Sequence, residues 1–112
     1  MQDSIIVWTD RAEAGRAARW LARRLAARGV PADTADARAR DFEARWSDLI
    51  ALVYPRASRQ MLMLSIVTTA AGVSVEIVAE RCGRIAEAGA RRLRVARVSG
   101  EIDGLTRLRL AA

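Results

Sequence analysis

Three short apolar runs divide the chain, and polar or charged residues flank each of them. They are residues 5–8, residues 49–54, which Pro55 ends, and residues 61–69. Nearly uninterrupted apolar runs of this length are typical of strands that are buried on both faces. The pattern therefore predicts that these three runs form the centre of a mainly parallel β-sheet.

A long amphipathic segment follows the first run. Thr9 and Asp10 offer N-cap side chains for a helix over residues 11–28, and Gly29 ends it. Small and apolar residues recur there at intervals of three and four, at Ala14, Ala17, Ala18, Leu21 and Leu25. This spacing predicts one stripe packed against the sheet and a row of arginines facing solvent.

The segment between the first two runs predicts two minor elements. Residues 30–36 are short and polar and contain Pro31, so we expect a weak strand at the sheet edge. Residues 37–46 predict a short helix, with Phe42 and Trp46 one turn apart on its inner face.

The second half of the chain predicts one more helix and two strands. Ser74 is a suitable N-cap for a helix over residues 75–88, which Gly89 ends. Apolar and polar residues alternate over residues 92–95 and again over 105–110, as in strands joined by a hairpin.

The middle run has a second interpretation. Phe42, Trp46, Leu49 and Val53 also fit one continuous helix through Tyr54, and periodicity alone does not decide between the two. We favour a strand, because Ser47 and Asp48 interrupt the pattern and every position from 49 to 53 is apolar. In that arrangement residues 55–60 are a shortened crossover, the third of the sheet.

Composition indicates a single folded domain over residues 1–112. Hydrophobic residues make up 52% of the chain, too many for a disordered protein. The net charge is +6, and all of the 19 basic residues are arginine. They are spread along the chain among 13 acidic residues, so nucleic acid is a possible partner but not the favoured one.

The chain contains few reactive side chains. It has no histidine and one cysteine, Cys82, which falls on the apolar side of the predicted helix 75–88 and is expected to be a buried core residue. No catalytic residue and no metal site are predicted. Residues 61–75 are uncharged but too short and too polar to span a membrane, and no signal peptide is evident, so we expect a cytoplasmic protein.

In this order of elements the chain resembles the flavodoxin-like proteins. The resemblance rests on residues 5–9 leading into the helix that ends at 25–30, and on residues 47–55, 67–72 and 88–90. It implies a small doubly wound α/β fold with a mainly parallel sheet, a C-terminal hairpin and a shortened third crossover.

The resemblance also implies a ligand, because flavodoxin-like proteins bind flavin mononucleotide (FMN) at the C-terminal ends of their strands and transfer electrons. FMN, or a related phosphate-bearing ligand, would then be held by residues of three loops that meet at one end of the sheet. These residues are Thr9, Arg11, Tyr54, Thr68, Thr69 and Gly72.

Two other functions are compatible with the sequence. Residues 57–112 could form a DNA-binding winged helix, with helices over 59–71, 75–82 and 85–97 and with Arg91, Arg92 and Arg94 facing phosphates.

Alternatively, the domain is a non-catalytic module for protein interaction or homo-oligomerisation. It would use an exposed Trp20 or the hairpin over residues 92–110, while Trp8 and Trp46 pack in the core.

Overall fold

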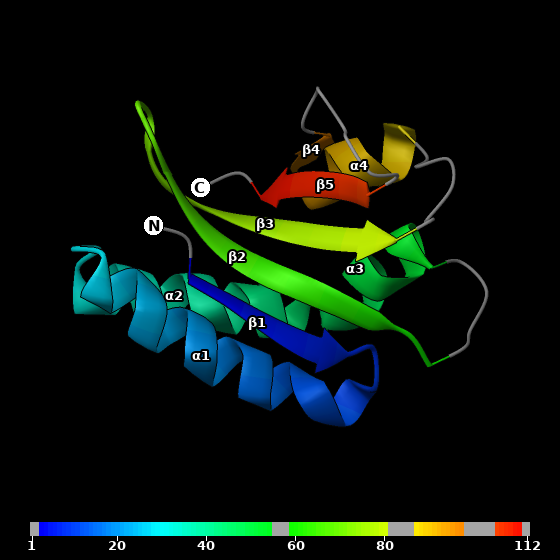
Figure 1. The fold of residues 1–112 in the computed structure, drawn as a ribbon, viewed down its shortest axis with the longest axis horizontal. Helices are drawn as coiled ribbons and strands as arrows, with labels where there is room; N and C mark the ends of the chain where they lie inside the picture. Colours follow the sequence, from blue (N-terminus) through cyan, green and yellow to red (C-terminus); the bar gives the residue numbers. More distant parts are fainter. Residues whose placement is uncertain (1–2, 55–58, 81–86, 98–104, 111–112) are drawn as a thin grey trace.

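The structure is a computed structural model, and it describes residues 3–54, 59–80, 87–97 and 105–110. Figure 1 shows a five-stranded sheet with helices packed against one of its faces. In chain order, the elements are β1 (Asp3–Trp8), the 3-10 helix η1 (Arg11–Glu13), α1 (Ala14–Ala27), α2 (Ala32–Ala44), α3 (Trp46–Val53), β2 (Met61–Thr69), β3 (Gly72–Glu80), α4 (Glu87–Leu93), β4 (Val95–Arg97) and β5 (Leu105–Leu110).

All neighbouring strands of the sheet are antiparallel, in the order β1-β2-β3-β5-β4. The prediction of a mainly parallel, flavodoxin-like sheet is therefore wrong. The predicted strands at the N-terminus, at 61–69 and at 105–110 are confirmed. The predicted strand over 92–95 is wrong except at Val95, because α4 extends past Gly89, the predicted helix end, to Leu93. The strand that does form, β4, pairs antiparallel with β5, as expected of the C-terminal pair. The error lies in the connections between strands, which the apolar runs do not specify.

The hairpin between β2 and β3 explains much of this difference. Thr69 pairs with Gly72 across a turn of two residues, and Gly72 has a φ of +120°, which glycine adopts at little cost. From Val73 onward, apolar residues occupy every second position, and this is the strand period. The predicted helix over 75–88 is therefore wrong up to Glu80. Residues 81–86, with Cys82, lie outside the described residues.

The winged-helix arrangement is also absent from the described part of residues 57–112. Its first two helices fall on β2 and β3, which are strands. Only the third overlaps a described helix, α4, and α4 ends at Leu93.

The apolar run at 49–54 belongs to a helix, α3, so the strand prediction is wrong and the alternative is right except for a break at Arg45. Leu49 and Val53 are buried in the core. Leu52 lies on another side of the helix and approaches α4 so closely that a Cβ at Gly89 would be 3.0 Å from its Cδ1. A helix covered on more than one side is apolar at almost every position, as a buried strand is.

The predicted edge strand over 30–36 is wrong as well. Pro31 is the N-cap residue of α2, and Asp33 lies in the first turn, where a carboxylate interacts favourably with the helix dipole. The predicted helix 37–46 is confirmed over residues 37–44, the later part of α2, while Trp46 begins α3. Phe42 is buried and meets the Trp46 ring edge to face, with the ring centroids 5.6 Å apart.

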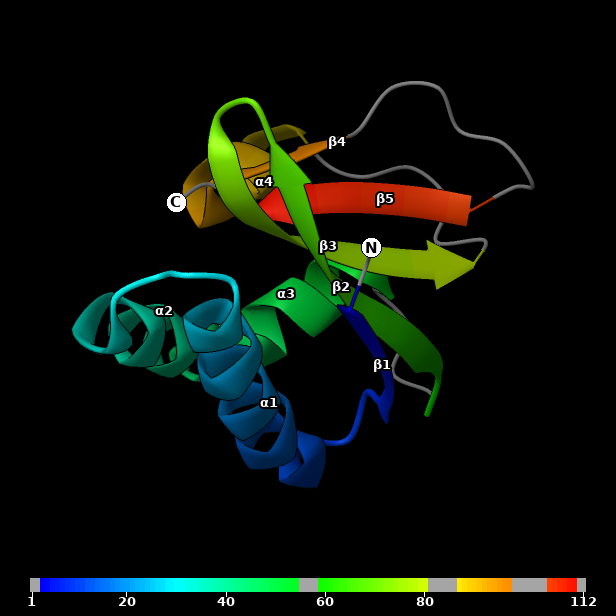
Figure 2. The ribbon, with the colours of Figure 1, turned by 60° about the vertical axis from the view of Figure 1, so that its left-hand side comes forward.

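The core lies between the sheet and the layer of helices, as the rotated view in Figure 2 shows. The predicted stripe of α1 is confirmed, because Ala14, Ala17, Ala18, Leu21 and Leu25 are all buried. Gly29 follows the helix with a φ of +93°, as expected of a glycine that ends a helix. None of the helices within the described ranges is long and apolar enough to cross a lipid bilayer.

Candidate functional site

Side chains alternate along each strand, so the sheet has a core face and an outer face. The core face carries Ile5, Leu64, Ile77 and Leu108, which lie side by side in the strand register. In Figures 1 and 2, none of the described helices crosses the opposite, outer face. The outer face consists of Ser4, Ile6 and Trp8 of β1, Met61, Met63, Ser65 and Val67 of β2, Ser74, Glu76 and Val78 of β3, and Leu105, Arg107 and Arg109 of β5.

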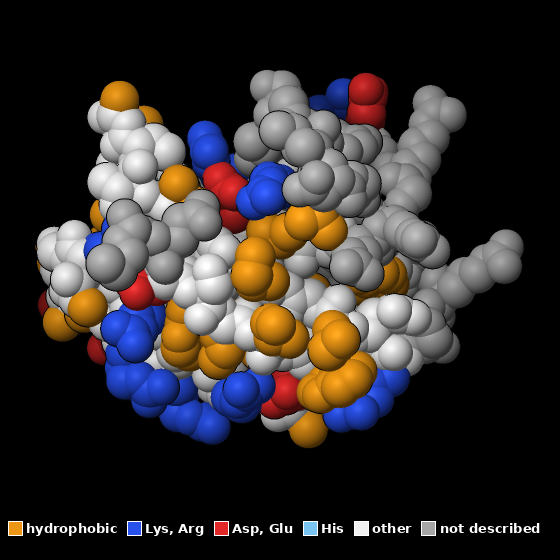
Figure 3. All heavy atoms as spheres, viewed as in Figure 1, with side chains coloured by type: hydrophobic (Ala, Val, Ile, Leu, Met, Phe, Trp, Pro, Cys, Tyr) orange, Lys and Arg blue, Asp and Glu red, His pale blue; other side chains and the backbone are white. Residues whose placement is uncertain are grey.

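The outer face holds an unusual amount of exposed apolar surface. Among the described residues, the exposed large hydrophobic side chains are Ile6 (60% exposed), Met61 (54%) and Trp8 (36%), and all three belong to this face. Together with the partly exposed Met63 and Leu105 and with Val78, which is buried beside Met63, they form what we call the apolar band. Figure 3 looks onto this face, where orange side chains run across the middle of the sheet.

A shallow hollow of about 290 Å³ lies within the apolar band. Its walls are mainly aliphatic and thioether groups, with the Tyr54 ring at one side. The lining residues are Ile6, Tyr54, Gln60, Met61, Leu62, Met63, Val78 and Leu105. Trp8 is not part of the lining, so the band places a large aromatic side chain beside a depression.

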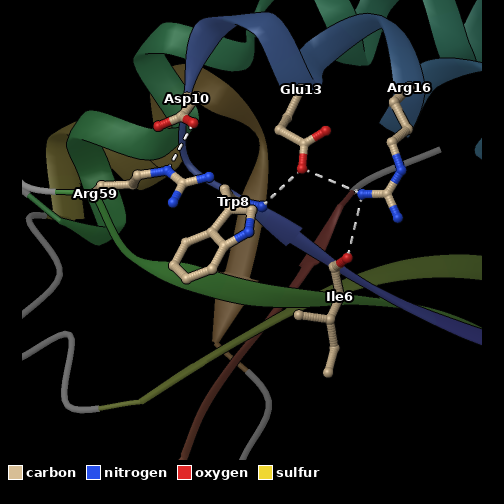
Figure 4. Close-up of polar contacts among 6 residues, drawn as sticks. All are labelled: Ile6, Trp8, Asp10, Glu13, Arg16 and Arg59. Carbon is tan, nitrogen blue, oxygen red and sulfur yellow. Dashed lines mark hydrogen bonds and ion pairs between the residues drawn. The ribbon is translucent and has the colours of Figure 1, made fainter.

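Trp8 is held in place by Arg59. The guanidinium carbon of Arg59 lies 3.9 Å from the centroid of the Trp8 ring, and its Nε donates to Asp10 Oδ2 at 2.8 Å. Figure 4 shows this stack of carboxylate, guanidinium and indole. An exposed cation–π contact contributes only about 0.5–1 kcal/mol, but here it fixes the orientation of the most prominent side chain of the band.

The free edge of β1 is partly closed by side chains from the start of the helical segment. The Trp8 backbone N–H donates to Glu13 Oε1 at 3.3 Å, and Arg16 Nη1 donates to the Ile6 carbonyl at 3.4 Å. The two side chains also pair with each other at 3.2 Å, as Figure 4 shows. These contacts occupy backbone groups that another strand would need, so they hinder edge-to-edge pairing.

A polar row crosses the outer face next to the apolar band. Ser4 and Ser65 hydroxyls are 3.0 Å apart. Glu76 is 4% exposed, and Arg109 Nη2 and Nε donate to its Oε2 at 2.8 and 3.3 Å. The charges of Glu76 and Arg109 neutralise each other, so the described residues in the middle of the face include no unpaired carboxylate.

The chain matches no family model, no curated protein and no solved structure. Its function must therefore be inferred from its own surfaces.

The residues predicted to bind FMN fall into two groups. Thr9 and Tyr54 lie where β1 ends and β2 begins: Thr9 Oγ1 accepts from the Gln60 backbone N–H at 3.0 Å, and Tyr54 Oη donates to the Met61 carbonyl at 3.1 Å. Arg11 is exposed nearby in η1.

Thr68, Thr69 and Gly72 lie at the other end of β2, in the hairpin to β3. Seven residues of extended chain separate Met61 from Thr68, which is about 23 Å. The six residues therefore do not share one end of the sheet, as the parallel arrangement required, and we do not propose FMN binding or electron transfer.

Two of the three tryptophans, Trp8 and Trp20, are the reverse of what we expected from the sequence. Trp20 is 7% exposed and belongs to the core, whereas Trp8, predicted to be buried, is 36% exposed on the outer face. Trp46 is buried as predicted.

The described residues contain no group of three or more His, Cys, Asp or Glu side chains arranged to hold a metal ion. The outer face presents apolar surface framed by paired charges, a combination suited to recognising another protein surface.

One sequence signal pointed to the outer face. In β2, Met61 and Met63 alternate with Leu62 and Leu64, and it is the methionines that face outward. Methionine is common at adaptable binding surfaces. In this apolar strand, the methionine positions therefore indicate the outer side and the leucine positions the core side.

Proposed function

We propose that this protein is a non-catalytic interaction module that forms a homodimer through the outer face of its sheet. The observation that carries the proposal is that Ile6, Trp8 and Met61, the exposed large hydrophobic side chains of the described residues, gather on that one face. Contiguous exposed apolar surface rimmed by polar residues is typical of protein interfaces.

A second copy of the chain is a suitable partner because the face is self-complementary. Trp8 projects beside the hollow that Ile6, Met61 and Met63 help to line. A two-fold axis through the band would place the Trp8 of each copy near the hollow of the other, as isologous dimer interfaces require.

The blocked edge of β1 favours this face-to-face arrangement. Strand addition would need the Ile6 carbonyl and the Trp8 N–H, which Arg16 and Glu13 occupy. Packing through the outer face leaves both contacts intact.

The size of the face sets the expected strength of the dimer. Four strands spaced about 4.8 Å apart, up to nine residues long, present on the order of 500 Å². Two such faces would bury on the order of 1,000 Å², near the lower limit for a specific interface. We therefore expect a reversible dimer with a micromolar dissociation constant.

Salt distinguishes this dimer from a complex with nucleic acid. Each copy carries a net charge of +6, so two copies repel at long range, and salt screens that repulsion. The dimer should become tighter as the salt concentration rises. A complex with a polyanion should become weaker.

Sedimentation equilibrium over a range of concentrations tests the proposal. Ile6→Lys removes about 100 Å² of exposed apolar surface, worth about 2.5 kcal/mol per copy if the dimer buries it. This variant should raise the dissociation constant at least ~100-fold. Ala26→Lys adds the same charge at an exposed position of α1, away from the outer face, and is the matched control. A wild type that remains monomeric at all concentrations, or equal effects of the two variants, would refute the proposal.

A further inference from the structure

A groove beside the β2–β3 hairpin, at one end of the sheet, is the basis of a second inference. It runs between α2 and the adjoining ends of β3 and β5, and consists of two adjoining cavities of about 480 and 740 Å³. The residues that line both cavities mark the middle of the groove. They are Thr34, Arg38, Val73, Ser74, Arg94 and Leu110.

Cations outnumber anions in the lining, which contains five arginines and two aspartates. Three of the arginines are engaged by carboxylates at close range: Arg28 by Asp3 at 3.1 Å, Arg45 by Asp41 at 2.5 Å and Arg109 by Glu76 at 2.8 Å.

The two remaining arginines lie in the middle of the groove. Arg38 Nη1 donates to the Val73 carbonyl at 3.2 Å and has no carboxylate partner among the described residues. Arg94 approaches Asp41 only at 4.0 Å, and Asp41 is already paired with Arg45. Asp33, the other aspartate of the lining, forms no ion pair with either arginine among the described residues. Arg38 and Arg94 therefore bring positive charge to the middle of the groove that no carboxylate of their own neutralises.

The backbone at Arg94 has a conformation that an arginine rarely adopts. Its φ is +56°, the left-handed region, directly after the last residue of α4. Glycine is the usual residue at this position of a helix end, because other L-residues are strained there. Strained backbone of this kind occurs often at ligand-binding sites, and the Arg94 side chain lines both cavities.

The groove also has an apolar wall. The smaller cavity, of about 480 Å³, has the usual size of small-molecule sites. The buried core side chains Leu21, Leu25, Phe42 and Val75 form its floor, and the partly exposed Val73 lies at its wall. An apolar wall beside unneutralised arginines suits a ligand with an apolar or aromatic body and an anionic group.

We infer that this groove binds a small soluble phosphate monoester with an apolar or aromatic body, whose phosphate lies between Arg38 and Arg94. Arginine is suited to this role because its planar fork can donate two parallel hydrogen bonds to phosphate oxygens. Arg38 and Arg94 do not belong to the outer face, so their contact with the phosphate does not require the proposed dimer, although Ser74 and Arg109 of the outer face also line the groove.

Phenyl phosphate is a suitable probe, followed through the backbone amide signals of the ¹⁵N-labelled protein. Saturable one-to-one shifts are expected at Thr34, Arg38, Val73 and Ser74. Phenol lacks the phosphate and should cause no saturable shift, and inorganic phosphate lacks the ring and should bind the same residues at least 10-fold more weakly.

Arg38→Gln and Arg94→Gly should each weaken phenyl phosphate binding at least 10-fold. Arg94→Gly is informative because glycine accepts the local φ, so the variant is expected to fold. Arg23→Gln is the control: it removes the same charge from an exposed position of α1 outside the groove. Non-saturable shifts spread over the α1 arginines, or an equal loss with Arg23→Gln, would show unspecific attraction of anions and overturn the inference.

Discussion

The pair formed by Glu76 and Arg109 should show an asymmetric response to mutation. The Glu76 side chain is 5% exposed and that of Arg109 is 38% exposed. Arg109→Met leaves a buried carboxylate without its cation, whereas Glu76→Gln leaves a guanidinium that can turn into water. Removal of the arginine should therefore cost more stability than neutralisation of the acid.

The magnitudes follow from the exposure of each partner. Loss of one member of a buried ion pair costs about 3–5 kcal/mol, and the partial exposure of this pair reduces the expected cost of Arg109→Met to about 2–3 kcal/mol. Glu76→Gln loses charge-assisted hydrogen bonds but strands no buried charge, so about 1 kcal/mol is expected. The double variant should resemble Glu76→Gln, giving a coupling energy of about 2 kcal/mol.

Urea unfolding followed by tryptophan fluorescence measures these differences, at one fixed protein concentration because dimerisation adds to apparent stability. With an m-value of about 1.5 kcal/mol per M, Arg109→Met should lower the midpoint by about 1.3–2 M. Single-variant effects that are equal in size and add up in the double variant would refute the reasoning, since they would mean that water already screens the pair.

Three further predictions concern single positions. Gly72→Ala should destabilise the protein by about 1–2 kcal/mol in the same urea assay, because φ is +120° there while the space for a Cβ is open; an unchanged midpoint would contradict the hairpin geometry. Arg94→Gly should instead raise the free energy of unfolding by about 1 kcal/mol, because it removes the strain at a φ of +56°. A lower free energy of unfolding would mean that the contacts of the Arg94 side chain stabilise the fold by more than the strain costs. Dilution of the protein from above to below the dimer dissociation constant should increase the quenching of tryptophan fluorescence by acrylamide. The reason is that Trp8 is exposed in the monomer while Trp20 and Trp46 stay buried. Trp8→Phe should abolish this increase.

The sequence was sufficient where the local pattern has one physical solution. Residues 61–69 were predicted as a strand with the bounds that β2 has, and the alanine and leucine stripe of α1 is buried as expected. In both segments the spacing of the apolar residues and the residues at the ends of the segment indicate the same type of secondary structure.

Prediction failed where burial on several sides erased the pattern. Residues 49–53 are apolar at every position because α3 contacts both the core and α4, and the same sequence suits a buried strand. Once this helix was assigned as a strand, a parallel sheet followed, and the two-residue hairpin at Ala70 and Ala71 was overlooked.

Neither candidate site follows from sequence alone. Ile6, Met63 and Val78 of the apolar band are far apart in the sequence and become neighbours only through the pairing of β1, β2 and β3. The groove brings together Arg38 of α2 and Arg94, which follows α4, and no local motif links these two residues.

The most direct test of the proposed dimer is an isotope-filtered nuclear Overhauser experiment on a mixed sample. One half of the protein carries ¹³C-labelled methionine methyl groups, and the other half is unlabelled. The outer-face dimer predicts intermolecular contacts from the methyl groups of Met61 and Met63 to the Trp8 ring. A dimer whose intermolecular contacts lie elsewhere, or a sample with none at millimolar concentration, would contradict the account.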